Sequence, residues 1–361
     1  MRKNVDQSLT HLEHNLYSFT NKTFNYIHLG LTWNCALQCS ECTRTTMGER
    51  EKAAIPSDLF DWEAYKNLLD RDGVTKFHLC GNYGDPIYYK HLLRLCEYIK
   101  TKPESEITIH TNGSYKTNEF WGELATILQP EDTLVFSIDG TLSNSVIYRK
   151  GADPKSIQSG IQAVVDAPNR PQLKWKHLVF SYNIDTIEEA IDQAISLGFD
   201  QIEFQQPHYR NDTSLGVDWE VDDIANRIEY KFAWVTDFKN QVQIIMSDEG
   251  ENEKWITLPL DYLRNVTVSS IFPKCMNQTF LPFVELDGTF VPCCWMSTSA
   301  FKIGKLKEFY GEDYAKLNLK NNSVDDIMQQ WNKIIATWKT DTPLYNCVEA
   351  CGTNKEDKLG K

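Results

Sequence analysis

Cys35-Ala-Leu-Gln-Cys39-Ser-Glu-Cys42 is the stretch that decides the interpretation of this sequence. Its three cysteines have a C-x3-C-x2-C spacing and follow the apolar run Tyr26–Thr32, which predicts a strand leading into a tight loop. Three thiolates on such a loop can ligate three corners of an iron–sulfur cube. The fourth iron would then lack a protein ligand and would be open to a substrate.

Zinc, a disulfide and a ferredoxin-type cluster are the alternatives for these cysteines. A zinc site needs four ligands, commonly in two C-x2-C-like pairs, and only three cysteines are local here. A disulfide loop needs an oxidising compartment and an even number of cysteines. A ferredoxin-type run would include a nearby further cysteine followed by proline, and the next cysteine after Cys42 is Cys80. The spacing therefore favours an iron–sulfur cluster with one open iron.

The motif resembles the signature of the radical S-adenosylmethionine (SAM) enzymes. The resemblance implies that Cys35, Cys39 and Cys42 hold a [4Fe-4S] cluster whose open iron chelates the amino and carboxylate groups of SAM. It further implies reductive cleavage of the sulfonium, which releases a 5'-deoxyadenosyl radical that abstracts hydrogen from a substrate.

The composition is that of a globular protein with a sizeable core. The chain has 361 residues, of which 41% are hydrophobic and 12% aromatic, enough for one large domain or two moderate ones. The 50 acidic residues outnumber the 37 basic ones, for a net charge of −13. This balance argues against a nucleic-acid partner, which needs clustered basic charge, while one local pocket can still bind a small charged substrate.

The sequence contains no recognisable membrane or targeting segment. No apolar run reaches the roughly 18 residues that a transmembrane helix needs, and the N-terminus lacks the apolar centre of a signal peptide. Ten cysteines without a secretion signal predict a reducing, cytoplasmic location and metal ligation rather than disulfides. We therefore expect no membrane partner.

Strands and helices alternate from about residue 25 onward, which predicts a parallel sheet with helices packed outside it. The predicted strands are Tyr26–Thr32, Val74–Leu79, Ile107–His110, Thr133–Ile138, His177–Tyr182 and Gln201–Gln205. The predicted helices are Asp58–Leu69, Tyr89–Lys100, Glu119–Leu128, Pro154–Val165 and Ile187–Leu197. Six such units, the first of which leads to the cysteine loop, resemble the partial (β/α)6 barrel of the radical SAM enzymes.

The predicted fold class is α/β: a partial (β/α)6 TIM-like barrel followed by a small α+β iron–sulfur domain. The predicted divisions are an N-terminal arm (1–24), the barrel (25–211), a connecting helix and strand region (212–270) and an auxiliary-cluster domain (271–361). Within the connecting region we expect an amphipathic helix, a strand and a solvated acidic loop, at Asp218–Thr236, Gln241–Met246 and Ser247–Glu253 respectively.

The second strand is followed by Cys80-Gly-Asn-Tyr-Gly-Asp-Pro86, where the family has a Gly-Gly-Glu-Pro-like stretch that holds the SAM amino group. The resemblance places Gly84 and Asp85 at that site, and glycine lets the backbone approach a ligand closely. Asp85 is one methylene shorter than the usual Glu. The alternative is a plain Gly/Asp/Pro turn.

The later strand ends carry polar residues that the resemblance assigns to SAM. Asn112, Ser137 and Asp139 follow the third and fourth strands and would meet the ribose and the methionyl part. Arg149, followed by Lys150 and Gly151, would pair with the SAM carboxylate, because a guanidinium group can donate two parallel hydrogen bonds to a carboxylate. The alternatives are ordinary turn chemistry and a surface arginine.

Two further positions complete the candidate site. Asn183, at the end of the fifth strand, resembles a position that touches the ribose. Glu203, Gln205 and His208, at the sixth strand, would face the substrate side, and His208 is a candidate for proton transfer there. A lone histidine in a loop is more often without a catalytic role.

A second group of cysteines lies in the last third of the chain. Cys275-x12-Gly288-x4-Cys293 spans a predicted hairpin that would bring the two cysteines together, and Cys347-x3-Cys351 adds two more thiols. This pattern resembles the twitch domain, the shorter form of the SPASM extension of radical SAM enzymes. The resemblance implies one auxiliary [4Fe-4S] cluster on these four thiolates, and structural zinc is the alternative.

Three cysteines stand outside these two ligand sets. Cys294 is the alternative to Cys293, which the Gly-x4-Cys spacing favours. Cys80 and Cys96 have no partners at ligand spacing, so we expect buried core thiols.

The predicted function is that of a radical SAM enzyme with two [4Fe-4S] clusters and SAM as cofactors. The auxiliary cluster implies oxidation of a small molecule or a peptide side chain, with flavodoxin or ferredoxin as reductant. The short N-terminal arm leaves no room for a leader-binding domain of about 80 residues, which weakens a role in peptide maturation unless a separate protein supplies such a domain. The sequence also leaves open a nucleotide- or tRNA-modifying radical SAM enzyme and a non-catalytic metal-cluster scaffold.

Overall fold

The structure is a computed structural model that describes residues 18–20, 22–46, 60–205, 207, 233–237, 242–246, 252–255, 275, 281–297, 300–338 and 344–351. It is built on one sheet of eleven strands in the order β11-β10-β1-β2-β3-β4-β5-β6-β7-β8-β9. The strands are β1 (Tyr26–Leu29), β2 (Lys76–Leu79), β3 (Glu106–Thr111), β4 (Thr133–Ser137), β5 (Gln172–Leu178), β6 (Gln201–Gln205), β7 (Ala233–Asp237), β8 (Val242–Met246), β9 (Asn252–Trp255), β10 (Phe283–Val284) and β11 (Phe290–Val291).

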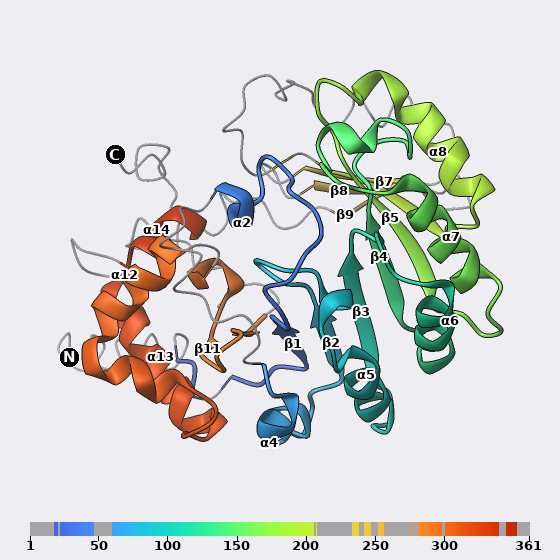
Figure 1. Cartoon of the computed structure of the whole chain (residues 1–361). Helices are drawn as coiled ribbons and strands as arrows, with labels where there is room; N and C mark the ends of the chain where they lie inside the picture. The colour runs from blue at the N-terminus through green and yellow to red at the C-terminus, as the bar shows by residue number, and fades with distance from the viewer. Residues whose placement is uncertain are drawn as a thin grey trace.

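The sheet is parallel from β10 through β1 to β7 (Figure 1). The outer strands β11, β8 and β9 run antiparallel to their neighbours. The carboxyl ends of the parallel strands therefore meet at one edge, where the loops that carry the candidate site residues begin.

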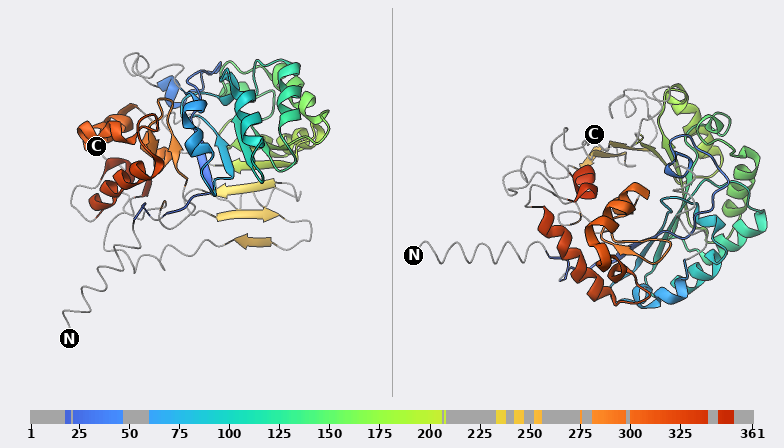
Figure 2. Two further views of the ribbon diagram at one scale, coloured as in Figure 1. Left: turned by 90° about the horizontal axis from the view of Figure 1, so that it is seen from below. Right: turned by 60° about the vertical axis from the view of Figure 1, so that its left-hand side comes forward.

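Helices join the parallel strands and lie outside the curved sheet (Figure 2). The α-helices are α2 (Thr43–Thr46), α4 (Lys66–Leu69), α5 (Leu92–Lys100), α6 (Asn118–Ile127), α7 (Pro154–Val165), α8 (Ile187–Ser196), α12 (Ala300–Tyr310), α13 (Val324–Thr337) and α14 (Tyr345–Cys351). The 3-10 helices are η1 (Trp62–Tyr65), η2 (Pro86–Tyr88), η3 (Ser145–Ile147), η4 (Ile184–Thr186), η5 (Cys294–Ser297) and η6 (Gly311–Leu317). None of the helices in the described part of the chain is long and apolar enough to cross a membrane.

Capping residues set the helix ends locally. The side chains of Thr117, Asp153 and Ser323 accept hydrogen bonds from the first-turn amides of α6, α7 and α13. Such caps contribute about 1 kcal/mol each. Gly198 follows α8 with a φ of +80°, the left-handed conformation expected of a residue that ends a helix.

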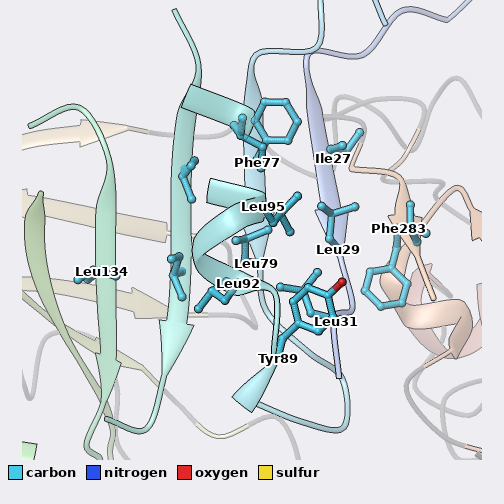
Figure 3. Packing of buried hydrophobic residues seen from close by; sticks show 14 of the residues in the cluster. Ile27, Leu29, Leu31, Phe77, Leu79, Tyr89, Leu92, Leu95, Leu134 and Phe283 are labelled. Carbon is cyan, nitrogen blue, oxygen red and sulfur yellow. The ribbon is translucent and has the colours of Figure 1, made fainter. Parts of the chain in front are cut away.

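The outer face of the sheet is apolar and fully covered. Along β1 and β2 every second residue is buried, and these side chains pack against α5, where Leu92 and Leu95 meet Leu79 (Figure 3). The same row continues through Ile109 of β3 and Leu134 of β4. Each of these side chains contributes about 1.5–3 kcal/mol by burial, so this face supplies much of the stability of the fold.

The inner face of the sheet is polar. Most of the half-buried residues at alternate positions of the parallel strands are polar, and they include Tyr26, His28, Lys76, His78, Glu106, Thr108, His110, Lys174, Lys176 and Glu203. Residues paired in the register of neighbouring strands face the same side of the sheet, so these side chains form rows across the concave side of the barrel. This face is chemically suited to a polar ligand rather than to a packed core.

The C-terminal elements close onto the sheet beside β1. β10 pairs with β1, and Trp331 of α13 donates its indole N–H to the Phe290 carbonyl oxygen at 3.0 Å. The described part of the predicted N-terminal arm packs there too, since the Phe19 amide donates to Asn332 Oδ1 at 2.8 Å and its ring meets Trp331 edge-on. The N-terminal and C-terminal segments thus share one core with the barrel.

The structure corrects the predicted elements at several places. The helix predicted over Asp58–Leu69 is, within the described residues, the 3-10 helix η1 followed by the short α4. The fifth strand is Gln172–Leu178 rather than His177–Tyr182, because the alternating residues 172–178 pair with both β4 and β6. The helix predicted over Asp218–Thr236 is wrong from residue 233, where β7 pairs with β6; its earlier part lies outside the described residues. The end of the predicted acidic loop belongs to β9.

Candidate active site

Three thiols lie on the loop after β1, as the sequence predicts. Cys39 is buried, and Cys35 and Cys42 are half-buried. The loop is tightened by hydrogen bonds from the Cys42 amide to the Cys39 carbonyl oxygen (3.1 Å) and from the Leu37 amide to Cys35 Sγ (3.4 Å). It is anchored to the neighbouring turn, because the Gln38 amide donates to the Lys150 carbonyl oxygen at 2.9 Å.

An apolar wall shields the loop from solvent. Leu37 and Cys39 pack with Tyr148 and Phe180, whose ring centroids are 4.7 Å apart. Water-poor surroundings strengthen electrostatic interactions at the sulfurs.

Burial raises the pKa of two of these thiols, Cys35 and Cys39. The pKa of Cys35 rises to about 11, mainly by desolvation, with the charges of Asp85 and Cys39 adding to the shift. The pKa of Cys39 is likewise raised by burial, and Arg149 opposes that shift. A raised pKa favours the protonated thiol. A bound metal centre favours the thiolate instead, since a coordinating thiol is deprotonated. Three soft sulfur donors with N–H groups directed at them fit an iron–sulfur cluster.

Arg149 lies beside the thiol loop and is held by Asp139. Its Nε and Nη2 are 2.6 and 2.5 Å from Asp139 Oδ2, and its Nη1 is 3.9 Å from Cys39 Sγ. The second Asp139 oxygen accepts the Leu178 amide at 2.8 Å, and Asn183 Nδ2 donates to the Asp139 carbonyl oxygen at 3.0 Å. Asp139 and Asn183 therefore orient Arg149 toward the sulfurs.

Asp85 and Asn112 meet next to Cys35. Asp85 Oδ2 accepts hydrogen bonds from the Asn112 amide (2.7 Å), from Asn112 Nδ2 and from Thr111 Oγ1 (3.1 Å). Asn112 Nδ2 is also 3.5 Å from Cys35 Sγ. Burial raises the pKa of Asp85 to about 6, and these donors oppose the shift. At neutral pH the carboxylate therefore carries its charge within the site.

Gly84 allows the β2 turn to contact the loop after β1. A Cβ at this position would lie 2.2 Å from the Thr32 carbonyl oxygen, which no real Cβ tolerates. The close approach also lets the Asp85 amide donate to the Asn34 carbonyl oxygen at 2.9 Å. The glycine is thus required by backbone contact next to the cysteine loop.

We expect Gly84→Ala to destabilise the protein by about 1–3 kcal/mol, because the two backbones must separate. Gly122→Ala is the matched control, because Gly122 lies in α6 and no other atom lies within 4 Å of a Cβ placed there. Alanine at this position should stabilise the protein by up to about 1 kcal/mol through its higher helix propensity. Urea unfolding of the iron-free protein measures both. Equal unfolding free energies for the two variants would contradict the tight contact.

The remaining predicted site residues have different surroundings. Ser137 ends β4 opposite Lys176, on the inner face. His208 lies outside the described residues. Glu203 and Gln205 belong to β6, where Glu203 lies 3.8 Å from Lys174 and Gln205 is buried.

Cys275 lies near the other three thiols of the second group. Burial raises the pKa of Cys275, and the neighbouring Cys293, Cys347 and Cys351 raise it further. Cys347 has the same neighbours Cys351 and Cys293, and burial raises its pKa too. The β10–β11 hairpin turns at Gly288, whose φ is +89°, and so delivers Cys293 as expected. Four thiols fit a closed [4Fe-4S] cluster or a zinc ion.

Cys294 has a different environment from Cys293. Its pKa is lowered, mainly by a hydrogen bond with Cys293, and Cys80 and Glu285 also lie near it. Cys80 itself is half-buried, so the expectation of a buried core thiol is wrong there, whereas Cys96 is fully buried as expected. Cys80 is half-buried because it follows β2 on the same face as Lys76 and His78, the inner face of the sheet.

Comparison with known proteins identifies the architecture. No family model matches the sequence, and no curated protein matches it. Among solved structures, Streptococcus suis SuiB bound to S-adenosylmethionine is 18% identical with a TM-score of 0.51, covering 82% of this chain and 65% of SuiB. SuiB bound to the precursor peptide SuiA is 17% identical with a TM-score of 0.57, covering 97% of this chain and 74% of SuiB. The structure of anSMEcpe with bound AdoMet is 13% identical with a TM-score of 0.53, covering 93% of this chain and 91% of anSMEcpe.

All three of these structures are radical SAM enzymes with the same sheet-and-helix arrangement. The fold is that of the radical SAM enzymes. In this radical SAM fold the cysteine loop follows β1, at the same sheet edge as the Asp85, Asn112 and Asp139 loops. The chain spans slightly less than two thirds of the length of SuiB in its SAM-bound form.

Sequence reasoning missed several residues that shape the site in this radical SAM fold. The Tyr148–Phe180 wall and the Lys150 carbonyl contact depend on long-range packing, for which the sequence carries no local signal. The polar rows on the inner face had a signal: His28 and His78 alternate with buried apolar residues in two short strands.

Proposed function

We propose that the protein is a radical SAM enzyme that cleaves S-adenosylmethionine reductively. The observation that carries the proposal is the loop of Cys35, Cys39 and Cys42, with Arg149 next to Cys39 and the Asp85–Asn112 pair next to Cys35. When bound, a [4Fe-4S] cluster on these cysteines supplies the electron that cleaves SAM to methionine and a 5'-deoxyadenosyl radical.

The side chains around the loop have separate roles in this proposal. Arg149 places a cation beside the thiolate of Cys39 and offsets its charge, while Asp139 fixes the guanidinium by a hydrogen bond and an ion pair. Asp85 provides a buried negative charge for the SAM ammonium group, and Asn112 connects that carboxylate to Cys35. The wall of Leu37, Tyr148 and Phe180 excludes water from the radical.

The second thiol group extends the proposal to oxidation. Cys275, Cys293, Cys347 and Cys351 are proposed to hold an auxiliary [4Fe-4S] cluster, because Cys275 and Cys347 each lie near other thiols of the group and all four are buried or half-buried. The chemistry available from a cluster at this position is transfer of an electron away from the substrate. A flavodoxin or ferredoxin is the proposed reductant of the first site.

A peptide side chain is the substrate class that we favour. SuiB has been solved bound to its precursor peptide SuiA, and anSMEcpe has been solved with AdoMet and the Cp18Cys peptide. The polar inner face of this chain offers lysine, glutamate and histidine side chains for such a substrate. Oxidation of a small molecule is the alternative within the same chemistry.

Formation of 5'-deoxyadenosine tests the proposal. We expect the anaerobically reconstituted protein to form 5'-deoxyadenosine and methionine in equal amounts from SAM and dithionite, without added substrate. Chromatography with mass detection measures both products. Cys96→Ala is the control, because it removes a buried thiol of α5 that belongs to neither cysteine group and should leave the rate unchanged. A fully reconstituted protein that leaves SAM intact would reject the proposed function.

A further inference from the structure

A third group of metal-binding side chains lies on the inner face of the barrel. His28 of β1 and His78 of β2 are paired in the parallel register, and Cys80 follows β2 with the same parity as His78. The potential ligand atoms of these three residues all lie within 4.8 Å of one another. This group is separate from both sets of cysteines described above.

The histidine rings are fixed in place by their neighbours. The rings of His28 and His78 are 4.8 Å apart, and His28 also packs edge-on against Phe283, at 4.6 Å. His28 Nε2 contacts the carbonyl oxygen of Cys80, so its ring is directed toward that residue. Held in this way, the side chains would lose little further freedom when they bind an ion.

We propose that His28, His78 and Cys80 form a binding site for a borderline divalent cation of the Zn²⁺ class. Two imidazole nitrogens and one thiolate sulfur suit such an ion, whereas Mg²⁺ and Ca²⁺ require oxygen ligands. All three residues are half-buried, so an ion has access from the concave side. Three protein ligands leave a fourth coordination position for water or a substrate donor atom, the arrangement of catalytic rather than structural zinc sites.

The surrounding contacts place this site between the two thiol groups. Cys80 directly precedes the turn in which Asp85 binds the first thiol loop, since the Asp85 amide donates to the Asn34 carbonyl oxygen. Two residues after Cys80, Asn82 Nδ2 donates to the Cys294 carbonyl oxygen at 3.3 Å, next to the ligand candidate Cys293. The open position of the ion would therefore face a substrate between the two groups.

Zinc content and its coordination test this proposal independently of the proposed SAM chemistry. The full chain, loaded with iron and sulfide, is incubated with Zn²⁺, desalted and analysed by mass spectrometry of metals. We expect about one zinc per chain, with a Zn K-edge absorption spectrum fitted by nitrogen at about 2.0 Å and sulfur at about 2.3 Å. Less than about a tenth of a zinc per chain would overturn the proposal, as would a shell of four sulfurs, the signature of zinc in the auxiliary group.

Two variants and one control separate ligation from folding. His78→Phe should lower bound zinc at least tenfold, and Cys80→Ala should do the same and remove the sulfur shell. His110→Phe is the control: its ring lies 4.6 Å from His78 on the same face but outside the ligand group, so zinc should stay near one per chain. Iron content and thermal midpoints are measured on every variant. Equal zinc loss in all three, or full zinc retention in both ligand variants, would overturn the site.

Discussion

Cys39→Ser is expected to abolish 5'-deoxyadenosine formation, lowering the rate to less than about a thousandth of that of the unaltered protein, or about 4 kcal/mol in activation free energy. Cys39 is the most buried of the three loop thiols, with 5% of its surface exposed, and it alone contacts Arg149. A serine hydroxyl at this position is a harder donor and stays protonated, so it would not replace the thiolate on iron.

Iron content provides the second readout for Cys39→Ser. It should fall from about eight to about four atoms per chain, because the auxiliary thiols are intact. The control is Cys96→Ala, which should retain both the iron and the activity. If Cys39→Ser kept its iron and its product formation while its thermal midpoint was unchanged, the loop would not hold the reactive cluster.

The fold was largely predictable because local patterns agree with the sheet. β2, β3, β4 and β6 fall within one or two residues of the predicted strands, and α7 has the predicted bounds. Their apolar residues alternate or form runs between Gly, Asn, Asp and Pro, and the caps of α6 and α7 lie in the sequence itself.

β5 shows where local patterns fail. Its inner-face residues Lys174 and Lys176 make the strand appear polar. The apolar residues Val179 and Phe180 come after the strand, and Phe180 packs against the cysteine site. The strand is defined by pairing on both sides, with β4 and β6, and that information is non-local.

The candidate site also has a part that local sequence motifs predict and a part that they do not. The cysteine spacings, the glycine turn and the strand-end residues are local motifs, and the sequence places them at one sheet edge. The partners are not local: Arg149 lies ten residues from Asp139 in sequence, and Asn112 lies 27 residues from Asp85. Only the register of the parallel strands brings these groups together, and with them the inner-face histidines.

The choice between Cys293 and Cys294 yields the second large prediction. The two thiols are adjacent in sequence, but Cys293 is a neighbour of Cys275 and Cys347, whereas Cys294 begins η5 with Cys80 and Glu285 around it. The auxiliary cluster should therefore depend on Cys293 and not on Cys294.

Cys293→Ser is expected to lose the auxiliary cluster, so that iron falls from about eight to about four atoms per chain while the SAM-cleaving cluster is retained. Uncoupled 5'-deoxyadenosine formation should continue within about twofold, because the first thiol loop is untouched, and oxidation of a substrate should be lost. Cys294→Ser is the matched control and should keep about eight irons. Loss of iron in Cys294→Ser, with iron retained in Cys293→Ser, would show that Cys294 rather than Cys293 is the cluster ligand. Retention in both variants would mean that the four thiols hold no iron, which is the outcome expected of a zinc site.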